Sequence, residues 1–342
     1  MLRTFTLWLV GVLSVLLALE LLCRVLPVST STDTGYYTDP VILTYPPRHQ
    51  WVAATGWDLR NAQHLTANNL GYAAHRDFVR DARAVALIGD SFVEASMLPA
   101  PDRPGKQLEH WLGSRPVYAM GSPGTSLLDY AERIRYAHEK LGVRDFVILM
   151  ERGDVAQSLC GSGHVNGPCL DPITLAPLMK TLLPAGMVKR LLRHSALAQY
   201  LVSQLRVTPA GLGALFKPAS PPQPVAAKAS VITTSEELRI VDRVTQVFFA
   251  RIKPHVQGRL IIVLDSDRSV LYSGKSISDE GRERFMQLAN EAGATVIDTQ
   301  PIFAAHVANS ALKLEVGPYD QHLNPLAIGL ISQAASKALG GL

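Results

Sequence analysis

The chain has 342 residues, of which 47% are hydrophobic and 18% are charged, and its formal net charge is +4. This length and apolar fraction are sufficient for one large hydrophobic core or for two domains. The positive charge is small and scattered along the chain, so nucleic acid is not indicated as a partner.

An apolar run opens the chain. Residues 5–23 are apolar except for Thr6, Ser14 and Glu20, and a helix of this length would span a bilayer. A cleaved signal peptide and a buried globular helix are the alternatives. The run is long for a signal peptide, and no clear cleavage site of small residues follows it. We therefore predict a membrane anchor over residues 1–27.

The charges around this run predict its orientation. Arg3 and the amino terminus precede the apolar residues, and positive charge favours the cytoplasmic side. Glu20 and Arg24 are four residues apart near the far end, where the two side chains can pair and reach the interface. The rest of the chain is thus expected outside the cytoplasm.

Two cysteines flank a short turn rich in glycine. Cys160 and Cys169 are nine positions apart, and in an oxidising compartment such a pair is expected to form a disulfide. A zinc site that includes His164 is the alternative, but a fourth ligand at familiar spacing is missing. The sequence shows no nucleotide, flavin or other metal signature, so no cofactor is predicted.

The remaining chain alternates short apolar runs with amphipathic stretches. Residues 28–68 have little periodicity and predict an extended connector. Five strands are expected at 84–88, 116–120, 145–150, 259–264 and 294–298.

Helices are expected between these strands and after the last one. Capping boxes begin at Ser126 and Thr234, and Asn324 precedes a final helix whose first residue is Pro325. Strands alternating with helices indicate a parallel sheet. We predict an α/β fold, a three-layer α/β/α sandwich on a five-stranded parallel sheet, over residues 69–342, with an insertion at about 170–230.

Three side chains of the predicted sandwich suit nucleophilic catalysis. Ser91 follows the first strand, and His322 lies in the loop before the last helix, two residues after Asp320. A serine hydroxyl is activated when a histidine takes its proton and a carboxylate orients that histidine. The carboxyl ends of parallel strands share one edge, where open α/β sheets build their sites. The α/β-hydrolase pattern G-x-S-x-G is absent, because the second glycine is missing.

These motifs resemble those of the SGNH/GDSL hydrolases, and in particular the single-span bacterial members whose catalytic domain faces the periplasm. The resemblance is carried by Gly89-Asp90-Ser91, by Gly124 and by Asp320 and His322. It implies a flavodoxin-like sheet with strand order 2-1-3-4-5 and an inner-membrane, single-pass protein. It also implies Ser91 as the nucleophile, His322 as the base and Asp320 as its partner.

The oxyanion hole is where the sequence departs from the family. The resemblance implies the backbone amides of Ser91 and Gly124 as donors. The family also uses an asparagine after the third strand, where this chain has Gly153, which offers only its amide. Arg152 or Asn166 could replace the missing donor. A second departure is the spacing D-x-H instead of D-x-x-H.

Two functions are therefore open. The first is a cell-envelope serine hydrolase of acyl esters, acetyl esters of carbohydrate above all, or an acyltransferase using the same site. The second is a catalytically impaired member that binds envelope glycan or a partner protein. The membrane is expected to be a partner in both cases, through the N-terminal helix.

Overall fold

The structure is a computed structural model. It describes residues 2–30, 36–39, 41–57, 59–162, 167–180, 186–205, 207, 234–274, 279–317 and 320–341. The chain divides into two compact units. Unit 1 comprises residues 1–32, 50–66 and 183–229, and unit 2 comprises residues 33–49, 67–182 and 230–342.

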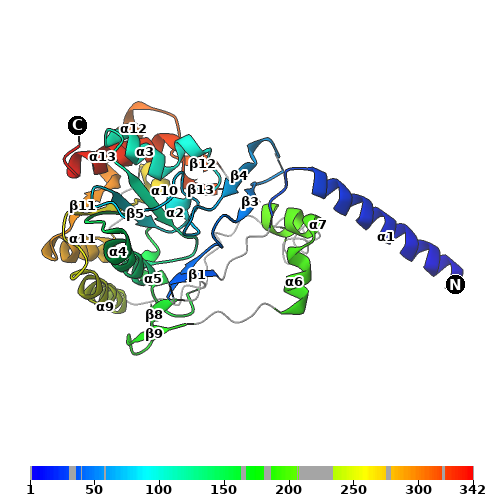
Figure 1. Ribbon diagram of the computed structural model, residues 1–342, viewed down its shortest axis with the longest axis horizontal. Helices are drawn as coiled ribbons and strands as arrows, with labels where there is room; N and C mark the ends of the chain where they lie inside the picture. Colours follow the sequence, from blue (N-terminus) through cyan, green and yellow to red (C-terminus); the bar gives the residue numbers. More distant parts are fainter. Residues whose placement is uncertain are drawn as a thin grey trace. The chain divides into compact units, whose positions relative to one another are not determined.

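Unit 2 is built on a five-stranded parallel sheet (Figure 1). Its strands are β5 (Val85–Gly89), β6 (Val117–Gly121), β7 (Asp145–Met150), β10 (Leu260–Leu264) and β11 (Thr295–Asp298). The order across the sheet is β11-β10-β7-β5-β6, which is the order 2-1-3-4-5 that the resemblance implied. Every residue of β5, β6 and β10 is buried, as expected for a sheet covered on both faces.

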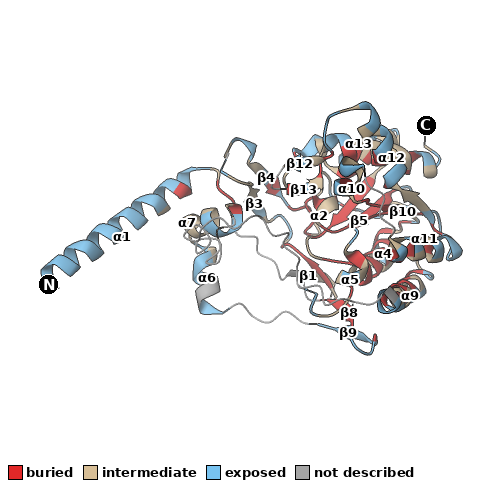
Figure 2. Cartoon of the chain, turned by 180° about the vertical axis from the view of Figure 1, so that it is seen from behind, coloured by how far each residue is buried: buried red, intermediate tan, exposed pale blue. Residues whose placement is uncertain are grey.

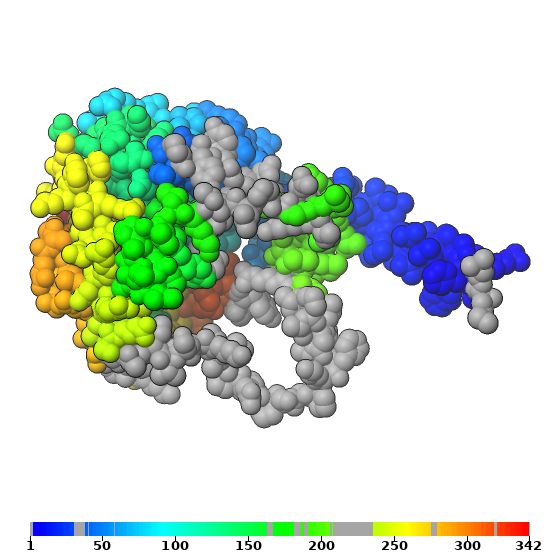
Figure 3. All heavy atoms as spheres, turned by 90° about the horizontal axis from the view of Figure 1, so that it is seen from below, coloured from blue at the N-terminus to red at the C-terminus, as the bar shows by residue number. Residues whose placement is uncertain are grey.

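Helices cover both faces of this sheet, whose strands are buried (Figure 2). Alternate residues of the strands belong to two separate clusters of buried apolar residues, one on each face. One face is covered by α4 (Leu127–Leu141), α9 (Thr234–Ile252) and α11 (Glu280–Glu291). Figure 3 shows α9 and α11 side by side, in yellow and orange. The other face is covered by α2 (Ser91–Glu94), α3 (Pro104–Trp111), α12 (Thr299–Asn309) and α13 (Pro325–Ala338). The predicted three-layer sandwich is confirmed.

The predicted helix boundaries follow from their caps. Ser126 and Asp129 form the capping box of α4, and Gly142 ends that helix with a positive φ of 72°. Asn324 caps α13, and Pro325 is its first residue. The sequence did not predict α2, α12, α5 (Asp154–Gln157) or α10 (Arg268–Ser273). Three of these are only four to six residues long, too short for a helical repeat to be visible.

The predicted connector over residues 28–68 contains short strands. β1 (Tyr36–Asp39) and β2 (Ile42–Thr44) form an antiparallel pair in unit 2. β3 (Gln50–Ala53) and β4 (Gln63–Thr66) form another in unit 1, with η1 (Leu59–Asn61) between them. The turn η2 (Ala100–Asp102) precedes α3.

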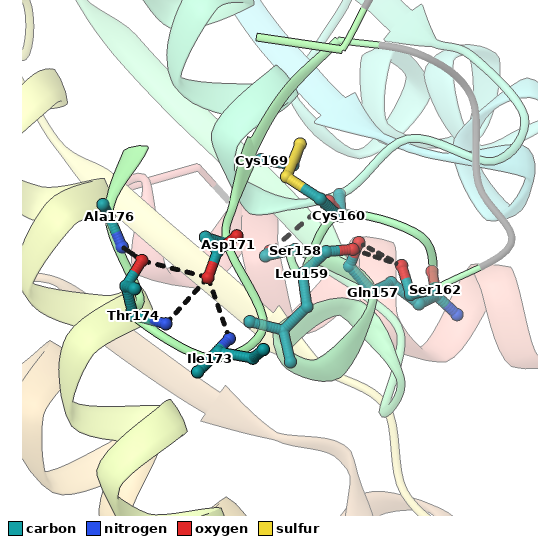
Figure 4. Close-up of a disulfide and its surroundings, with 11 residues drawn as sticks. Gln157, Ser158, Leu159, Cys160, Ser162, Cys169, Asp171, Ile173, Thr174 and Ala176 are labelled. Atoms are coloured by element: carbon teal, nitrogen blue, oxygen red, sulfur yellow. Dashed lines mark hydrogen bonds between the residues drawn. A yellow bond between two sulfur atoms is a disulfide. The ribbon is translucent and has the colours of Figure 1, made fainter. Parts of the chain in front are cut away.

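A disulfide joins Cys160 to Cys169, with a Cα–Cα distance of 5.1 Å (Figure 4). Cys169 lies on β8 (Pro168–Leu170), which pairs with β9 (Pro177–Met179). In the turn that follows, the Asp171 carboxylate accepts hydrogen bonds from the backbone of Ile173 and Thr174. The predicted disulfide is present, so neither thiol is free to bind zinc, and His164 lies outside the described residues.

Unit 1 contains α1 (Leu2–Val25), α6 (Met187–Arg193), α7 (Ala196–Ala198) and the π-helical turn η3 (Gln199–Gln204). Residues 3–25 of α1 are long and apolar enough to cross a membrane, and their most apolar window has no buried residue. The Glu20 carboxylate pairs with Arg24 at 2.8 Å, as the sequence suggested. The insertion predicted at about 170–230 is divided between the two units: residues 170–182 belong to unit 2, and residues 183–229 belong to unit 1.

Helix α2 approaches the sheet at two glycines. A Cβ on Gly121 would lie 2.3 Å from the backbone nitrogen of Glu94, and a Cβ on Gly89 would lie 2.5 Å from Val93. The two glycines are paired in register on β5 and β6. The φ of Gly89 is not positive, so close packing, and not a tight turn, is the reason for glycine at this position.

We predict that Gly121→Ala lowers the free energy of unfolding by about 2 kcal/mol or more, because the added methyl overlaps backbone atoms of α2. Thermal unfolding of the full chain in detergent measures the loss. Gly317→Ala is the matched control, since a Cβ there meets no atom within 4 Å. Equal stability of the two variants would contradict the packing argument.

Candidate active site

Ser91 is the first residue of α2, directly after β5. Asp90 caps this helix, and its carboxylate accepts a hydrogen bond of 2.8 Å from the backbone N–H of Phe92. The Ser91 side chain, which is half-buried, therefore stands at the carboxyl end of β5, between β7 and the edge strand β6 in the sheet. This is the edge at which parallel sheets place their sites.

The structure brings the three predicted catalytic side chains into one line. His322 Nε2 lies 2.9 Å from Ser91 Oγ, and His322 Nδ1 lies 2.5 Å from Asp320 Oδ1. Asp320 is buried, while His322 is partly exposed. Ser91 is more than 200 residues from Asp320 and His322 in the sequence. The C-terminal hairpin that carries the last two packs beside α2 and brings them to the serine.

Histidine 322 lies on a strand and not in the loop expected from sequence. β13 (Asp320–Leu323) pairs with β12 (Glu315–Gly317) in an antiparallel hairpin. Residues two apart on a strand face the same side, so the D-x-H spacing aligns Asp320 with the imidazole. The Asp320 Oδ1 atom also accepts the backbone N–H of His322 at 3.0 Å. The Phe92 ring packs 4.7 Å from the imidazole and limits its rotation.

Two of the backbone amides that the sequence suggested for an oxyanion hole are without an acceptor in the described residues. Among the described residues, the N–H groups of Ser91 and Gly124 have no protein acceptor. Gly124 has a φ of 71° in the turn after β6. That turn is fixed to the neighbouring strand, because the Ser122 N–H donates to the Gly89 carbonyl at 3.3 Å.

The third predicted donor, the backbone N–H of Gly153, already makes a hydrogen bond within the protein. Its N–H donates to the Glu151 carboxylate at 2.5 Å. Arg152 pairs with Asp267 at 2.5 Å, and Asn166 lies outside the described residues. A Cβ on Gly153 would lie 2.6 Å from the side chains of both Gln157 and Glu151. Gly153 thus supplies no free donor in this conformation, and an asparagine there would require these two side chains to move.

Asp154 fills a buried structural position. Its carboxylate accepts hydrogen bonds from the Glu151 N–H at 2.9 Å and from the Tyr130 hydroxyl at 3.0 Å. Burial raises the pKa of Asp154 well above its usual value, and the neighbouring Asp90 adds to the effect. The interpretation of Asp154 as a carboxylate that secures the end of β7 is therefore favoured over a catalytic role.

Two other buried carboxyls lie next to the serine in sequence. Burial raises the pKa of Asp90 to about 6 and the pKa of Glu94 to about 7. The Glu94 carboxylate accepts a hydrogen bond of 2.9 Å from the Tyr45 hydroxyl. Positive charge on His322 acts in the opposite direction on both pKa values, so these carboxyls are electrostatically coupled to the imidazole.

A buried ion cluster behind the histidine was not predicted from the sequence. Arg268 donates to Asp265 at 2.5 Å, to Glu315 at 2.9 Å and to the Gln321 carbonyl at 2.6 Å. Gln321 separates Asp320 from His322, so the guanidinium holds the strand that carries both. The available signal was Asp265 directly after the most apolar strand, because polar residues at that edge tend to belong to a site.

No group of three His, Cys, Asp or Glu side chains within the described residues is placed to hold a metal ion. The arrangement of Ser91, His322 and Asp320 needs none, because proton transfer to the imidazole suffices to activate the hydroxyl.

A scan against protein-family models gives no match, and a search of curated proteins gives none either. Solved structures give weak similarities. One is an alpha/beta hydrolase enzyme from the metagenome of Lake Arreo, Spain, with 13% identity and a TM-score of 0.40, covering 77% of this chain and 97% of that one. Another is a member of the lipolytic protein G-D-S-L family from Veillonella parvula, with 12% identity and a TM-score of 0.39, covering 76% and 99%.

A third similar structure is an acetyl xylan esterase from Geobacillus stearothermophilus, with 12% identity and a TM-score of 0.39, covering 77% of this chain and 97% of that one. At these identities and TM-scores the similarity is no evidence of activity or substrate. The fold class is established by the sheet order and the two helical layers of the chain itself.

We predict that Glu94→Gln removes part of the pH dependence of stability. The folded pKa of Glu94 is raised from 4.5 to about 7, so folding favours the protonated form, and stability falls as pH rises between these values. The variant should exceed the wild type by up to about 3 kcal/mol at pH 8 and match it near pH 4.5. Thermal unfolding across this pH range is the measurement. Glu280→Gln, at an exposed position, is the control. The difference in stability between this variant and the wild type should not grow with pH.

We predict that Arg268→Lys slows the reaction of Ser91 with a fluorophosphonate about tenfold, because an ammonium cannot keep all three contacts of the guanidinium fork. A positioning role predicts a lower maximal labelling rate with unchanged affinity for the probe. Arg284→Lys, at an ion pair with Asp242 on α9, is the control. Parallel loss of affinity and rate, or equal effects in both variants, would refute positioning by Arg268.

Proposed function

We propose that this chain is a membrane-anchored serine hydrolase of the SGNH/GDSL type that cleaves acyl esters. The observation that carries the proposal is the line from Ser91 Oγ to His322 Nε2 and from His322 Nδ1 to Asp320. A serine at the carboxyl edge of a parallel sheet, paired in this way, has a base within hydrogen-bond reach. The motifs around these residues resemble those of the same family.

In the proposed mechanism, Ser91 Oγ bonds to the carbonyl carbon of the ester while His322 Nε2 takes its proton. Asp320 holds the imidazole in the required tautomer and stabilises its charged form. The oxyanion of the tetrahedral intermediate accepts hydrogen bonds from the N–H groups of Ser91 and Gly124. The intermediate collapses, the alcohol leaves with the proton from His322, and an acyl group remains on Ser91.

A second nucleophile completes the cycle. Water gives a proton to His322 and bonds to the acyl carbon; the bond from that carbon to Ser91 Oγ then breaks, His322 returns the proton to Oγ, and the acid is released. A sugar hydroxyl in place of water would make the same site an O-acyltransferase. We propose acetyl esters of carbohydrate as the substrate class, on the strength of the family resemblance of Gly89-Asp90-Ser91 and Asp320-Gln321-His322.

The hydrogen bond from the Gly153 N–H to Glu151 favours a second candidate function. It leaves two backbone donors for the oxyanion, and removal of one such donor costs about 10²–10³ in rate. A negatively charged Glu151 near this position would also oppose an oxyanion. On this reading the chain binds acylated envelope glycan or a partner protein without turnover.

The proposed location is the inner membrane, with a single span. Helix α1 has the length and apolarity for this role, and Arg3 at its start favours a cytoplasmic amino terminus. The disulfide between Cys160 and Cys169 agrees with a periplasmic position for unit 2, because disulfides persist in oxidising compartments.

We predict that a fluorophosphonate labels Ser91 of the full chain, as located by mass spectrometry. Ser91→Ala should abolish labelling, and His322→Ala should reduce its rate by about 10³-fold or more, because the hydroxyl then lacks its base. Ser122→Ala, at a serine that follows β6 on the same sheet edge, should leave labelling unchanged. Absence of labelling on a protein with wild-type melting temperature would exclude the hydrolase and leave the binding function.

A further inference from the structure

Unit 1 contains a cavity of about 500 Å³ at the C-terminal end of α1. It is bounded by the last turn of α1 and the following turn, by β3 and β4, and by the end of α6 with α7. Four basic side chains line it: Arg24, His64, Arg193 and His194. No aspartate or glutamate is among its lining residues.

Hydrogen bonds tie the walls of this cavity to α1. Glu20 accepts from the Ser195 hydroxyl at 2.8 Å and from the backbone N–H groups of Ala196 and Leu197 at 3.1 and 3.0 Å. Arg24 donates to Glu20 and to the His194 carbonyl at 3.2 Å. The segment that begins at α6 is therefore fixed to the end of the apolar helix.

The charges of the cavity are not all balanced. Arg24 is paired with Glu20. The side chains of Arg193, His64 and His194 have no hydrogen-bond acceptor in the described part of the chain. One guanidinium and two imidazoles consequently line the cavity without a partner among the residues that the structure describes, which is a set of donors suited to a phosphate.

The whole of unit 1 is basic. Its residue ranges contain nine Lys and Arg residues and two acidic residues, Glu20 and Asp58. Its formal charge is thus +7, whereas the whole chain has +4, which leaves –3 for unit 2. Positive charge beside a membrane span attracts anionic lipid headgroups.

Apolar side chains accompany this charge. Met187, Leu191 and Leu192 of α6 are 71%, 67% and 50% exposed, and Val202 of η3 is 60% exposed. Large apolar residues interleaved with basic ones are typical of segments that lie in a membrane interface. A 23-residue helix of about 1.5 Å rise per residue slightly exceeds the hydrocarbon thickness of about 30 Å. The cavity at its end would then lie at headgroup depth.

We propose that this cavity binds the phosphate-bearing headgroup of an anionic membrane lipid, with Arg193, His64 and His194 as the phosphate donors. The proposal rests on the membrane placement of α1 and not on the hydrolase. Lipid binding and Ser91 labelling are measured separately, so either can fail while the other holds.

The test is native mass spectrometry of the full chain in a neutral detergent, titrated with dioctanoyl phosphatidylglycerol, dioctanoyl phosphatidylcholine or inorganic phosphate. We expect one phosphatidylglycerol to bind saturably, at least tenfold more tightly than either other probe. Arg193→Gln should weaken this binding about tenfold, as for loss of one charged hydrogen bond. His64→Gln, on β4, should weaken it less, and Arg193→Lys should retain most of it.

Arg239→Gln on α9 is the matched control, since it removes one exposed positive charge from unit 2 and should leave binding unchanged. Within the described residues the Arg193 side chain makes no hydrogen bond that its replacement would break, so the melting temperature of Arg193→Gln should equal that of the control. Equal binding of the two lipids, inorganic phosphate as tight as phosphatidylglycerol, or equal affinities of Arg193→Gln and Arg239→Gln would each overturn the proposal.

Discussion

Helix α2 lies against the carboxyl ends of β5 and β6 at a distance that excludes a side chain on Gly121. This contact decides where Ser91 stands, because the serine is the first residue of that helix. The Asp90 carboxylate accepts a hydrogen bond from the Phe92 amide at the start of the helix, so the backbone of Ser91 is fixed from both sides. Since the position of Ser91 is fixed, another part of the chain has to place His322 next to it.

The position of His322 depends on charged side chains that are buried beside the C-terminal hairpin. Arg268 joins the end of β10 to β12 and to the backbone between Asp320 and His322. Burial of a guanidinium costs free energy, because water is removed from the charge. Three acceptors offset much of this cost for Arg268, whereas an unpaired guanidinium would have no such compensation. Arg133 has a similar role on the opposite side, where it donates to the Gly89 and Met120 carbonyls. The edge of the sheet that carries the site is thus held by two buried arginines.

The two units have net charges of opposite sign, positive in unit 1 and negative in unit 2. Unit 2 surrounds its site with carboxyls whose pKa values are raised by burial. Unit 1 concentrates positive charge next to an apolar helix that has no buried face in its most apolar window. A negatively charged membrane surface attracts the second kind of surface and not the first, so the charge distribution agrees with the proposed membrane anchoring through unit 1.

The sequence by itself determined the sandwich. The apolar runs that become β5, β6, β7, β10 and β11 are continuous, and helix caps such as Ser126 and Asn324 are local signals, so neighbouring residues suffice to predict them. The same holds for the apolar helix α1. The disulfide was also predictable, because Cys160 and Cys169 are near in the chain.

Only the tertiary structure decided the rest. Nothing local indicates that Arg268 holds the histidine strand, or that residues 183–229 belong with α1 and not with the sandwich. Short elements such as α10 and β13 have too few residues to show a periodicity. Their positions follow from long-range packing and from the pairing of buried charges, which depend on residues distant in sequence meeting in space.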